Sequence, residues 1–351
     1  MEKKVINVGI IGCGRIAQTR HIPEYASNEN ANIVGYFDFN EDRAKEIAKK
    51  FGGKVYASVD QMLADSNIDA VSVCVTNSAH ASVSIKALNA GKNVLCEKPM
   101  ATSLEESEAM VKAAEDNHKT LMIDQNQRFA KSHVYAKKLL KEGQIGKVLT
   151  FKSNFGHGGP ETWSVDGGPN TWFFDKNKSK YGAIFDLGVH KIDLIQYLLE
   201  STVKDVTAKL ATLDKKDSQG NLIGVDDNAI SIYELENGAL GTVTSSWTYY
   251  GEEDNSTIIY GTKGIMKIYD DPKYSIKVIL KDGGEILYNI DQIQTNNNQT
   301  KSGVMDEFIS SLVEDREPSS DSGSVINTMR AIFASIESSK TGKNIVINKN
   351  N

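Results

Sequence analysis

The sequence VINVGIIGCGRIA, residues 5–17, decides the fold of this 351-residue chain. Its first seven residues form a short apolar run, which is typical of a strand buried in a parallel sheet. A G-x-G-x-x-A turn follows at Gly12, Gly14 and Ala17 and leads into a helical stretch. Gly12 permits a tight turn, and Gly14 lets backbone amides approach a pyrophosphate. Such a turn can be purely structural, but its place between strand and helix favours a dinucleotide-binding role.

A second predicted strand, Ile33–Phe37, ends at Asp38, about 20 residues beyond the glycine turn. A carboxylate at this position accepts hydrogen bonds from the adenosine ribose hydroxyls and repels a 2′-phosphate. The sequence therefore predicts NAD as the cofactor, with NADP less favoured. The pyrophosphate is expected at the positive end of the helix dipole. The residues expected to contact the cofactor here are Gly12, Gly14, Arg15, Ile16 and Asp38.

The bulk composition excludes several classes of protein. A chain of this length is too long for one ordinary core, so we expect two domains. The net charge of −6, without a basic block, argues against a nucleic-acid partner. No apolar run approaches the roughly 20 residues that span a bilayer, and the first strand begins too early for a signal peptide. The apolar runs are thus too short to predict a membrane partner. Cys13, Cys74 and Cys96 are odd in number and lack metal-ligand spacing, which predicts small buried residues of a cytoplasmic protein.

The first 125 residues alternate strand and helix, which predicts a parallel sheet with right-handed crossovers. We therefore assign residues 1–125 to an NAD-binding Rossmann domain. Ligands of such sheets lie beyond the carboxyl ends of the strands. The cofactor contacts expected at those ends are Thr76, Asn77, His80, Glu97 and Lys98. Lys98, Gln125 and Arg128 are expected to contact the substrate.

Residues 126–351 are rich in β-prone segments, from Lys147–Phe155 to Glu285–Ile290, joined by short turns as in antiparallel hairpins. We assign them to a substrate-binding and oligomerisation domain. Too few helices are predicted to cover both faces of this sheet. Because an exposed apolar sheet face usually marks an interface, the sequence predicts a homodimer or homotetramer.

The segment Gly182–Glu200 predicts a buried helix that carries polar groups on one stripe. Asp186, His190, Asp193 and Tyr197 recur at spacings of four, three and four, which places them on one face. Unpaired buried carboxylates are costly, so such a stripe favours a cleft in which His190 takes up a proton. A structural hydrogen-bond network explains the stripe equally well.

Two further segments carry candidate site residues. Lys98 follows a predicted parallel strand, so it should lie near the nicotinamide, where a lysine orients a hydroxyl and stabilises an alkoxide. Taken alone, the tripeptide around it could be a surface turn. In the segment 155–173, Trp163 and Trp172 suit stacking on a sugar ring, and His157 can donate to hydroxyls. A packed glycine loop with core tryptophans is the alternative.

Together these motifs resemble the glucose–fructose oxidoreductase / inositol dehydrogenase / rhizopine catabolism (Gfo/Idh/MocA) family over nearly the whole chain. The matching segments are Gly9–Ala17, Asp38, Thr76–His80, Ala87–Pro99, Arg128–Phe129, Gly143–Val148 and Gly182–His190. The resemblance implies an α/β fold: an N-terminal Rossmann domain with a parallel sheet, then an α/β domain with a large open, mainly antiparallel sheet. It also implies NAD(P)-dependent oxidation or reduction at a ring carbinol of a sugar or cyclitol, without a metal.

By motif position, Lys98, Asp186 and His190 match the family's catalytic trio. The resemblance thus predicts that His190 takes the hydroxyl proton while Lys98 and Asp186 orient the carbinol for hydride transfer to nicotinamide. A glycoside 3-dehydrogenase, or a redox step within glycoside cleavage, is the enzymatic alternative. A dinucleotide-dependent regulatory binder is the non-enzymatic one. The chain departs from the family at Lys180–Gly182, where glycine runs are common, so the resemblance predicts the class of substrate and not one sugar.

Overall fold

The computed structural model describes residues 4–165, 167–293 and 301–347, and these divide into two compact units. The first comprises Met1–Asn126 and Gln299–Ile326, and the second comprises Gln127–Asn298 and Asn327–Asn351. Our sequence-based division placed all of residues 126–351 in the second domain. The structure instead groups Gln299–Ile326 with the first unit. This segment holds α9 (Val304–Glu314), whose apolar face is buried, and Glu24 accepts a hydrogen bond from the Ser302 N–H at 2.6 Å.

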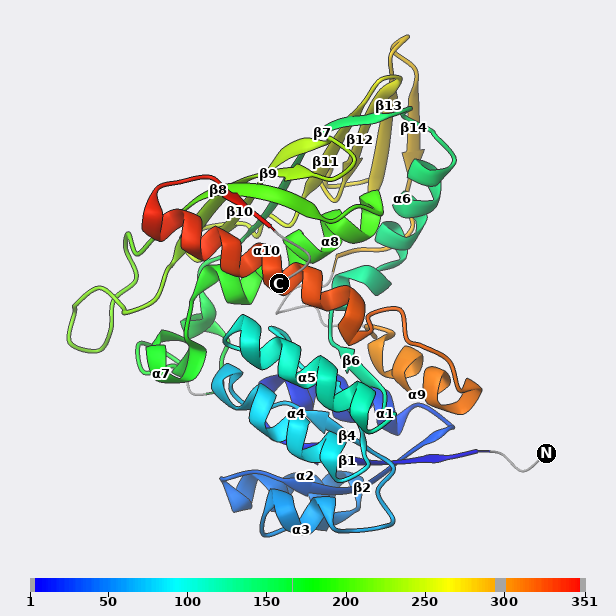
Figure 1. Cartoon of the computed structure of the whole chain (residues 1–351), viewed down its shortest axis with the longest axis vertical. Coiled ribbons are helices and arrows are strands. Elements are labelled where there is room, and N and C mark those ends of the chain that lie inside the picture. The colour runs from blue at the N-terminus through cyan, green and yellow to red at the C-terminus, as the bar shows by residue number, and fades with distance from the viewer. Residues whose placement is uncertain (1–3, 166, 294–300, 348–351) are drawn as a thin grey trace. The chain divides into compact units, whose positions relative to one another are not determined.

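The first unit contains a six-stranded parallel sheet in the described residues, with strand order β3-β2-β1-β4-β5-β6 (Figure 1). Its strands are β1 (Ile6–Ile11), β2 (Ala31–Phe37), β3 (Lys54–Val55), β4 (Ala70–Val73), β5 (Asn93–Cys96) and β6 (Leu121–Ile123). Its helices include α1 (Ile22–Ala26), α2 (Glu41–Phe51), α3 (Val59–Leu63), α4 (His80–Asn89) and α5 (Leu104–Asp116). The order reverses between β1 and β4, which is where open α/β sheets bind ligands.

The second unit contains a nine-stranded sheet in the described residues, with order β14-β13-β12-β11-β7-β10-β9-β8-β15. Neighbouring strands are antiparallel except for β7 and β10, which run parallel. The strands are β7 (Val148–Gly156), β8 (Val203–Ala211), β9 (Asn228–Leu235), β10 (Leu240–Ser246), β11 (Thr257–Gly261), β12 (Gly264–Ile268), β13 (Ile276–Leu280), β14 (Glu285–Tyr288) and β15 (Ile345–Val346). This architecture confirms the predicted fold class.

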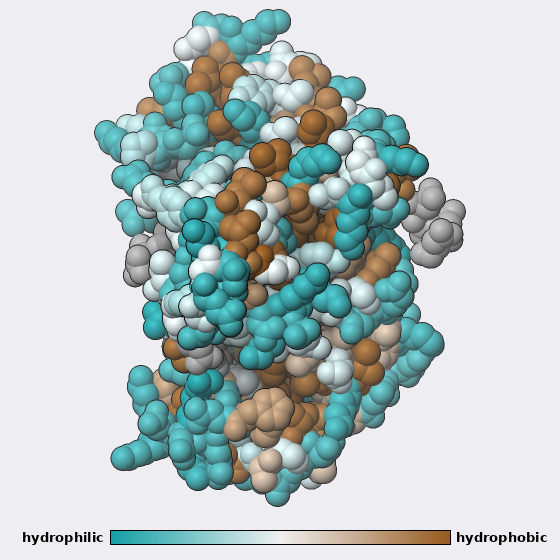
Figure 2. All heavy atoms as spheres, turned by 90° about the vertical axis from the view of Figure 1, so that its left-hand side faces the viewer, coloured by the Kyte–Doolittle hydropathy of each residue, from teal (hydrophilic) through white to brown (hydrophobic). Residues whose placement is uncertain are grey.

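One face of the nine-stranded sheet builds the core of the second unit. Its buried residues pack with those of α6 (Lys131–Lys141), α8 (Val189–Leu199) and α10 (Ser322–Thr341). Along β9, Ala229 and Tyr233 are buried, whereas Ile230 and Ile232 point to the other face and are 56% and 48% exposed. Figure 2 shows hydrophobic side chains interrupting the hydrophilic surface on one side of the molecule. Nowhere in the described ranges is a helix long and apolar enough to cross a membrane.

Candidate active site

The turn after β1 has the geometry that a pyrophosphate requires. Gly12 has φ +92°, and a Cβ built on it would lie 2.4 Å from the carbonyl oxygen of Cys74. A Cβ on Gly14 would meet no atom within 4 Å, so the backbone there is open to a ligand. The helical segment begins at Arg15, directly beyond this opening. Its first turns therefore present unpaired N–H groups where a phosphate would lie.

Asp38 is held at the end of β2 by backbone donors. Its carboxylate accepts hydrogen bonds from the N–H of Cys13 and the N–H of Asn40, both at 2.7 Å. The Arg43 guanidinium lies 3.6 Å from the same carboxylate. The acidic group is thus positioned beside the glycine turn, as ribose recognition requires. Arg43 is the nearby cation that a 2′-phosphate could recruit.

The loops after β4 and β5 are joined by His80. Its Nδ1 lies 2.6 Å from the Pro99 carbonyl oxygen, and its Nε2 lies 3.2 Å from the Val75 carbonyl oxygen. Burial lowers the pKa of His80, so the neutral ring is favoured. Thr76 and Asn77 lie in the same loop, at the start of a short 3₁₀ helix. His80 therefore links two loops of the predicted cofactor site, and its contact with the cofactor itself stays a prediction.

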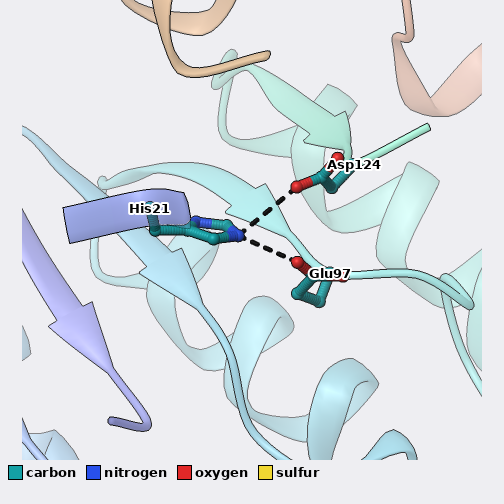
Figure 3. Close-up of side chains that lie close together, drawn as sticks. All are labelled: His21, Glu97 and Asp124. Carbon is teal, nitrogen blue, oxygen red and sulfur yellow. Dashed lines mark hydrogen bonds and ion pairs between the residues drawn. The ribbon is translucent and has the colours of Figure 1, made fainter. Parts of the chain in front are cut away.

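A buried histidine and two carboxylates lie close together at the ends of β5 and β6 (Figure 3). The Nε2 of His21 is 2.9 Å from the Glu97 Oε1 and 3.3 Å from the Asp124 Oδ2. Sequence reasoning missed His21 and Asp124. The pairing of Cys96 with Ile123 could have indicated the carboxylate pair, because the next residue on each strand is acidic.

The surroundings shift the pKa values of the three groups in this cluster differently. Burial lowers the pKa of His21, but Cys74, Asp124 and Glu97 raise it, and the net pKa lies well above the ordinary value. Burial opposes ionisation of Glu97, yet the hydrogen bond and charge of His21 bring its pKa to about 2. Burial and the charge of Glu97 raise the pKa of Asp124. The cluster therefore favours a protonated His21 beside an ionised Glu97.

In the second unit, Asp226 fixes the start of the helix that carries the predicted catalytic residues. Its carboxylate accepts hydrogen bonds from the N–H groups of Gly182 and Ile184, each at 2.8 Å. A Cβ on Gly182 would lie 1.9 Å from the Asp226 carbonyl oxygen, so only glycine fits there. Burial raises the pKa of Asp226 to about 6, although both donors lower it. Tyr181, the departure from the family pattern, packs against Phe185 with ring centroids 4.9 Å apart.

Asp186 and His190 lie one turn apart on this helical segment and are both 7% exposed. The Trp247 indole N–H donates to the Asp186 carboxylate at 3.0 Å, and the His157 Nε2 lies 3.9 Å from the same carboxylate oxygen. The rings of Phe155 and His190 are 5.9 Å apart. A carboxylate and two imidazoles thus share one aromatic-lined environment, which suits proton transfer from a hydroxyl.

The other half of the predicted stripe is structural. Arg128 forms two hydrogen bonds to the Asp193 carboxylate, each at 2.7 Å, and the Thr328 hydroxyl donates to that carboxylate at 2.9 Å. The Arg128 guanidinium also lies 5.7 Å from the ring centroid of Tyr197. Asp193 and Tyr197 therefore belong to a structural network, which was the alternative explanation of the polar stripe. Arg128 as a substrate contact stays a prediction that this ion pair does not favour.

The predicted specificity loop forms an aromatic cluster. The His157 Nδ1 accepts a hydrogen bond from the Gly159 N–H at 2.9 Å, so a neutral ring carries its proton on Nε2. Trp163 and Trp172 are both partly buried against Phe173, with centroid separations of 5.2 and 3.9 Å. The tryptophans therefore combine packing with partial exposure, and their contact with a sugar stays a prediction.

Among the buried polar groups that have no hydrogen-bond partner within the described part of the chain, two belong to predicted substrate contacts. One is the side-chain amide of Gln125, which is 1% exposed, and the other is the Trp163 indole N–H. An unpaired buried polar group is costly, so each position suits a ligand hydrogen bond.

Sequence reasoning also missed Lys191, which follows His190. Lys191 is fully buried, donates to the Asn255 carbonyl oxygen at 2.8 Å, and has its pKa lowered to about 7 by burial. Burial also raises the pKa of Glu253 to about 7. A lysine within a helix that the sequence predicts to be buried was the available signal, since a buried cation needs a partner.

We predict that two substitutions in the glycine turn affect different properties, one the stability of the protein and the other its affinity for NAD. Gly12→Ala should lower the free energy of unfolding by at least about 2 kcal/mol, because the new Cβ clashes at an unfavourable φ. Gly14→Ala has room for its methyl group, so it should leave stability unchanged and weaken NAD binding by about tenfold. Thermal unfolding and calorimetric titration with NAD measure the two effects. Unchanged NAD affinity in Gly14→Ala would contradict this position for the pyrophosphate.

Comparison with known proteins identifies related sequences and folds. Residues 6–125 match the family model "Oxidoreductase family, NAD-binding Rossmann fold", and residues 133–267 match "GFO/IDH/MocA C-terminal domain". Glucose-6-phosphate 3-dehydrogenase of Bacillus subtilis is 32% identical over 280 residues, which cover 78% of this chain and 77% of the relative. Levoglucosan dehydrogenase of Pseudarthrobacter phenanthrenivorans is 32% identical over 289 residues, which cover 74% and 72%.

A solved structure extends the likeness to the fold of the whole chain. The levoglucosan dehydrogenase complex with NADH and levoglucosan aligns with a TM-score of 0.86 and 24% identity, covering 99% of this chain and 100% of that one. The two proteins therefore share a fold although only 24% of their aligned residues are identical.

Proposed function

Because the chain belongs to the Gfo/Idh/MocA family of NAD-binding oxidoreductases, we propose that it transfers hydride between a sugar or cyclitol ring carbinol and NAD. The observation that carries this proposal is the grouping of Asp186, His190 and His157 within aromatic side chains in the second unit. Sugar rings combine apolar faces with hydroxyl groups. Aromatic side chains pack on the apolar faces, and the carboxylate and imidazoles form hydrogen bonds with the hydroxyls.

The residues divide the chemistry between them. The open backbone at Gly14 and the carboxylate of Asp38 hold the pyrophosphate and ribose. When bound, NAD supplies the nicotinamide carbon that accepts the hydride. His190 takes the hydroxyl proton, while Asp186, held by the Trp247 N–H, orients the carbinol. Lys98 stabilises the developing alkoxide.

A glycoside 3-dehydrogenase is the second candidate, and two relatives favour it. D-glucoside 3-dehydrogenase of Escherichia coli, 28% identical over 251 residues that cover 68% of this chain and 70% of the relative, supports both the glycoside and the 3-position. Glucose-6-phosphate 3-dehydrogenase, whose substrate is a sugar phosphate, supports the 3-position alone. Incubation with NAD and a hexose, hexoside and cyclitol panel, followed by NMR of the product, locates the new ketone. A C3 ketone on a glycoside selects this candidate, and a cyclitol ketone rejects it. A redox step within glycoside cleavage would additionally release the aglycone.

We predict that the proposed catalytic side chains control turnover. Lys98→Ala and His190→Ala should each lower kcat by about 100-fold or more, in line with general acid–base catalysis, while NAD affinity changes little. Formation of NADH with the panel substrates measures kcat. Lys112→Ala, which removes an exposed lysine paired with Asp116, is the matched control and should retain activity.

Two outcomes would contradict these roles. Full kcat in His190→Ala at every pH would show that another group takes the proton. NAD binding without turnover of any panel member by the wild type would instead favour the dinucleotide-dependent regulatory binder.

We predict that Asp38 sets the choice of cofactor. The wild type should bind NAD at least about tenfold more tightly than NADP, or about 1.4 kcal/mol. Asp38→Ala should shrink this difference, because it removes the repulsion of the 2′-phosphate and frees Arg43 to contact it. Calorimetric titration with both cofactors measures the difference, and equal wild-type affinities would refute the assignment.

We propose a homodimer or homotetramer joined through the outer face of the nine-stranded sheet. Ile230, Ile232 and Leu240 are each at least 48% exposed on neighbouring strands of that sheet. Light scattering should give a multiple of 38.5 kDa, and Ile230→Lys combined with Ile232→Lys should reduce the mass. A wild-type monomer at micromolar concentration would reject the proposal. Cytoplasmic location stays a prediction from the sequence.

A further inference from the structure

We propose that His21, Glu97 and Asp124 form a buried proton-holding network that positions Lys98 for catalysis. This role rests on the proposed function, because it acts through the lysine assigned to the alkoxide. The three side chains lie at the ends of β5 and β6 and on the helical segment after β1 (Figure 3). All three are almost completely buried. They are positioning residues rather than groups that contact the substrate.

Glu97 provides the link between the histidine and the lysine. Its Oε1 lies 2.9 Å from the His21 Nε2, and its Oε2 accepts a hydrogen bond from the backbone N–H of Lys98 at 3.2 Å. The carboxylate therefore connects the imidazole to the residue that carries the ammonium group. Loss of the imidazole would release the carboxylate and allow the turn at Lys98 to move, which costs rate even for small displacements.

His21 is itself fixed from its other ring nitrogen. Its Nδ1 lies 3.1 Å from the Ser72 hydroxyl on β4, and the Tyr25 hydroxyl on α1 lies 2.9 Å from the same oxygen. A protonated imidazole donates from both nitrogens, so it binds the Ser72 hydroxyl and Glu97 by hydrogen bonds and forms an ion pair with Asp124 at 3.3 Å. The network thus joins β4, the ends of β5 and β6, and α1, and it reaches the backbone of Lys98 through Glu97.

A proton fits this cluster better than a divalent cation. The distances of 2.9 and 3.3 Å from the Nε2 to the carboxylates are hydrogen-bond or ion-pair distances. Arg20 and Lys98 already supply positive charge, since both lower the pKa of Glu97. The almost complete burial of all three groups leaves no room for the waters that a cation with three protein ligands retains.

The bound proton predicts a pH dependence with a definite sign. The pKa of His21 is raised in the folded protein, so its contribution to stability is complete below pH 6.5 and is lost as pH rises through the folded-state pKa. The other charged or titratable groups that face the network are Arg20, Tyr25, Cys74 and Lys98, with Glu24 beside Asp124. The wild type should therefore lose thermal stability above pH 6.5 through a transition that His21→Gln lacks.

A double-mutant cycle tests whether the network acts through Lys98. We expect His21→Gln to lower kcat by about tenfold in the wild type but by less than about twofold in Lys98→Ala, because coupled residues are not additive. NAD affinity should stay unchanged in both. Asp124→Asn, of nearly equal shape, should show the same dependence on Lys98, and it serves as the test if His21→Gln fails to fold. Met62→Ala, a substitution of a fully buried core residue in the same unit outside the network, is the control for a loss of stability alone.

Three outcomes would overturn the inference. They are an equal kcat loss in both backgrounds, a comparable kcat loss in Met62→Ala, and a stoichiometric metal in the purified wild type that His21→Gln lacks. Full kcat in Lys98→Ala alone would instead refute the proposed function at that residue, and the inference would fall with it.

Discussion

The contact between Gly12 and the carbonyl oxygen of Cys74 is the constraint on which the first unit depends. A Cβ at Gly12 would lie 2.4 Å from that oxygen, so glycine alone lets the turn after β1 close against the end of β4. The closure brings the helix beginning at Arg15 to the point where the strand order reverses. Backbone donors and Asp38 then converge on one opening, which is what an NAD-binding site needs.

The second unit uses the same device at its candidate site. Gly182 lies so close to the Asp226 carbonyl oxygen that no side chain fits, and the Asp226 carboxylate binds the first backbone N–H groups of the helix. This fixes the axial position of Asp186 and His190, because both follow in the next two turns. In each unit, a glycine at a strand or helix end sets the position of the groups assigned to the chemistry.

Local patterns in the sequence predicted the features that depend on near neighbours. The strand, turn and helix around Gly12, the fold class, the oxidoreductase family and NAD are confirmed. Long-range pairing was harder. Asp193 and His190 share a helix face, but only the fold shows that Arg128 pairs with Asp193. Likewise, Gln299–Ile326 carry no local sign of belonging to the first unit, since the partners that bind them lie hundreds of residues earlier.

The His21 cluster explains why one kind of site residue escapes sequence reasoning. His21, Glu97 and Asp124 are 76 and 27 residues apart in order along the chain. They meet because β5 and β6 end side by side and the helical segment after β1 brings His21 to the same place. A lone histidine in a helix is most simply a satisfied buried group, and nothing local distinguishes it. Its role appears only when topology places two carboxylates on the same nitrogen and one of them binds the N–H of Lys98. Burial then makes the proton part of the structure, since an ionised Glu97 in a dry environment is stabilised by the charge of the imidazole that it contacts.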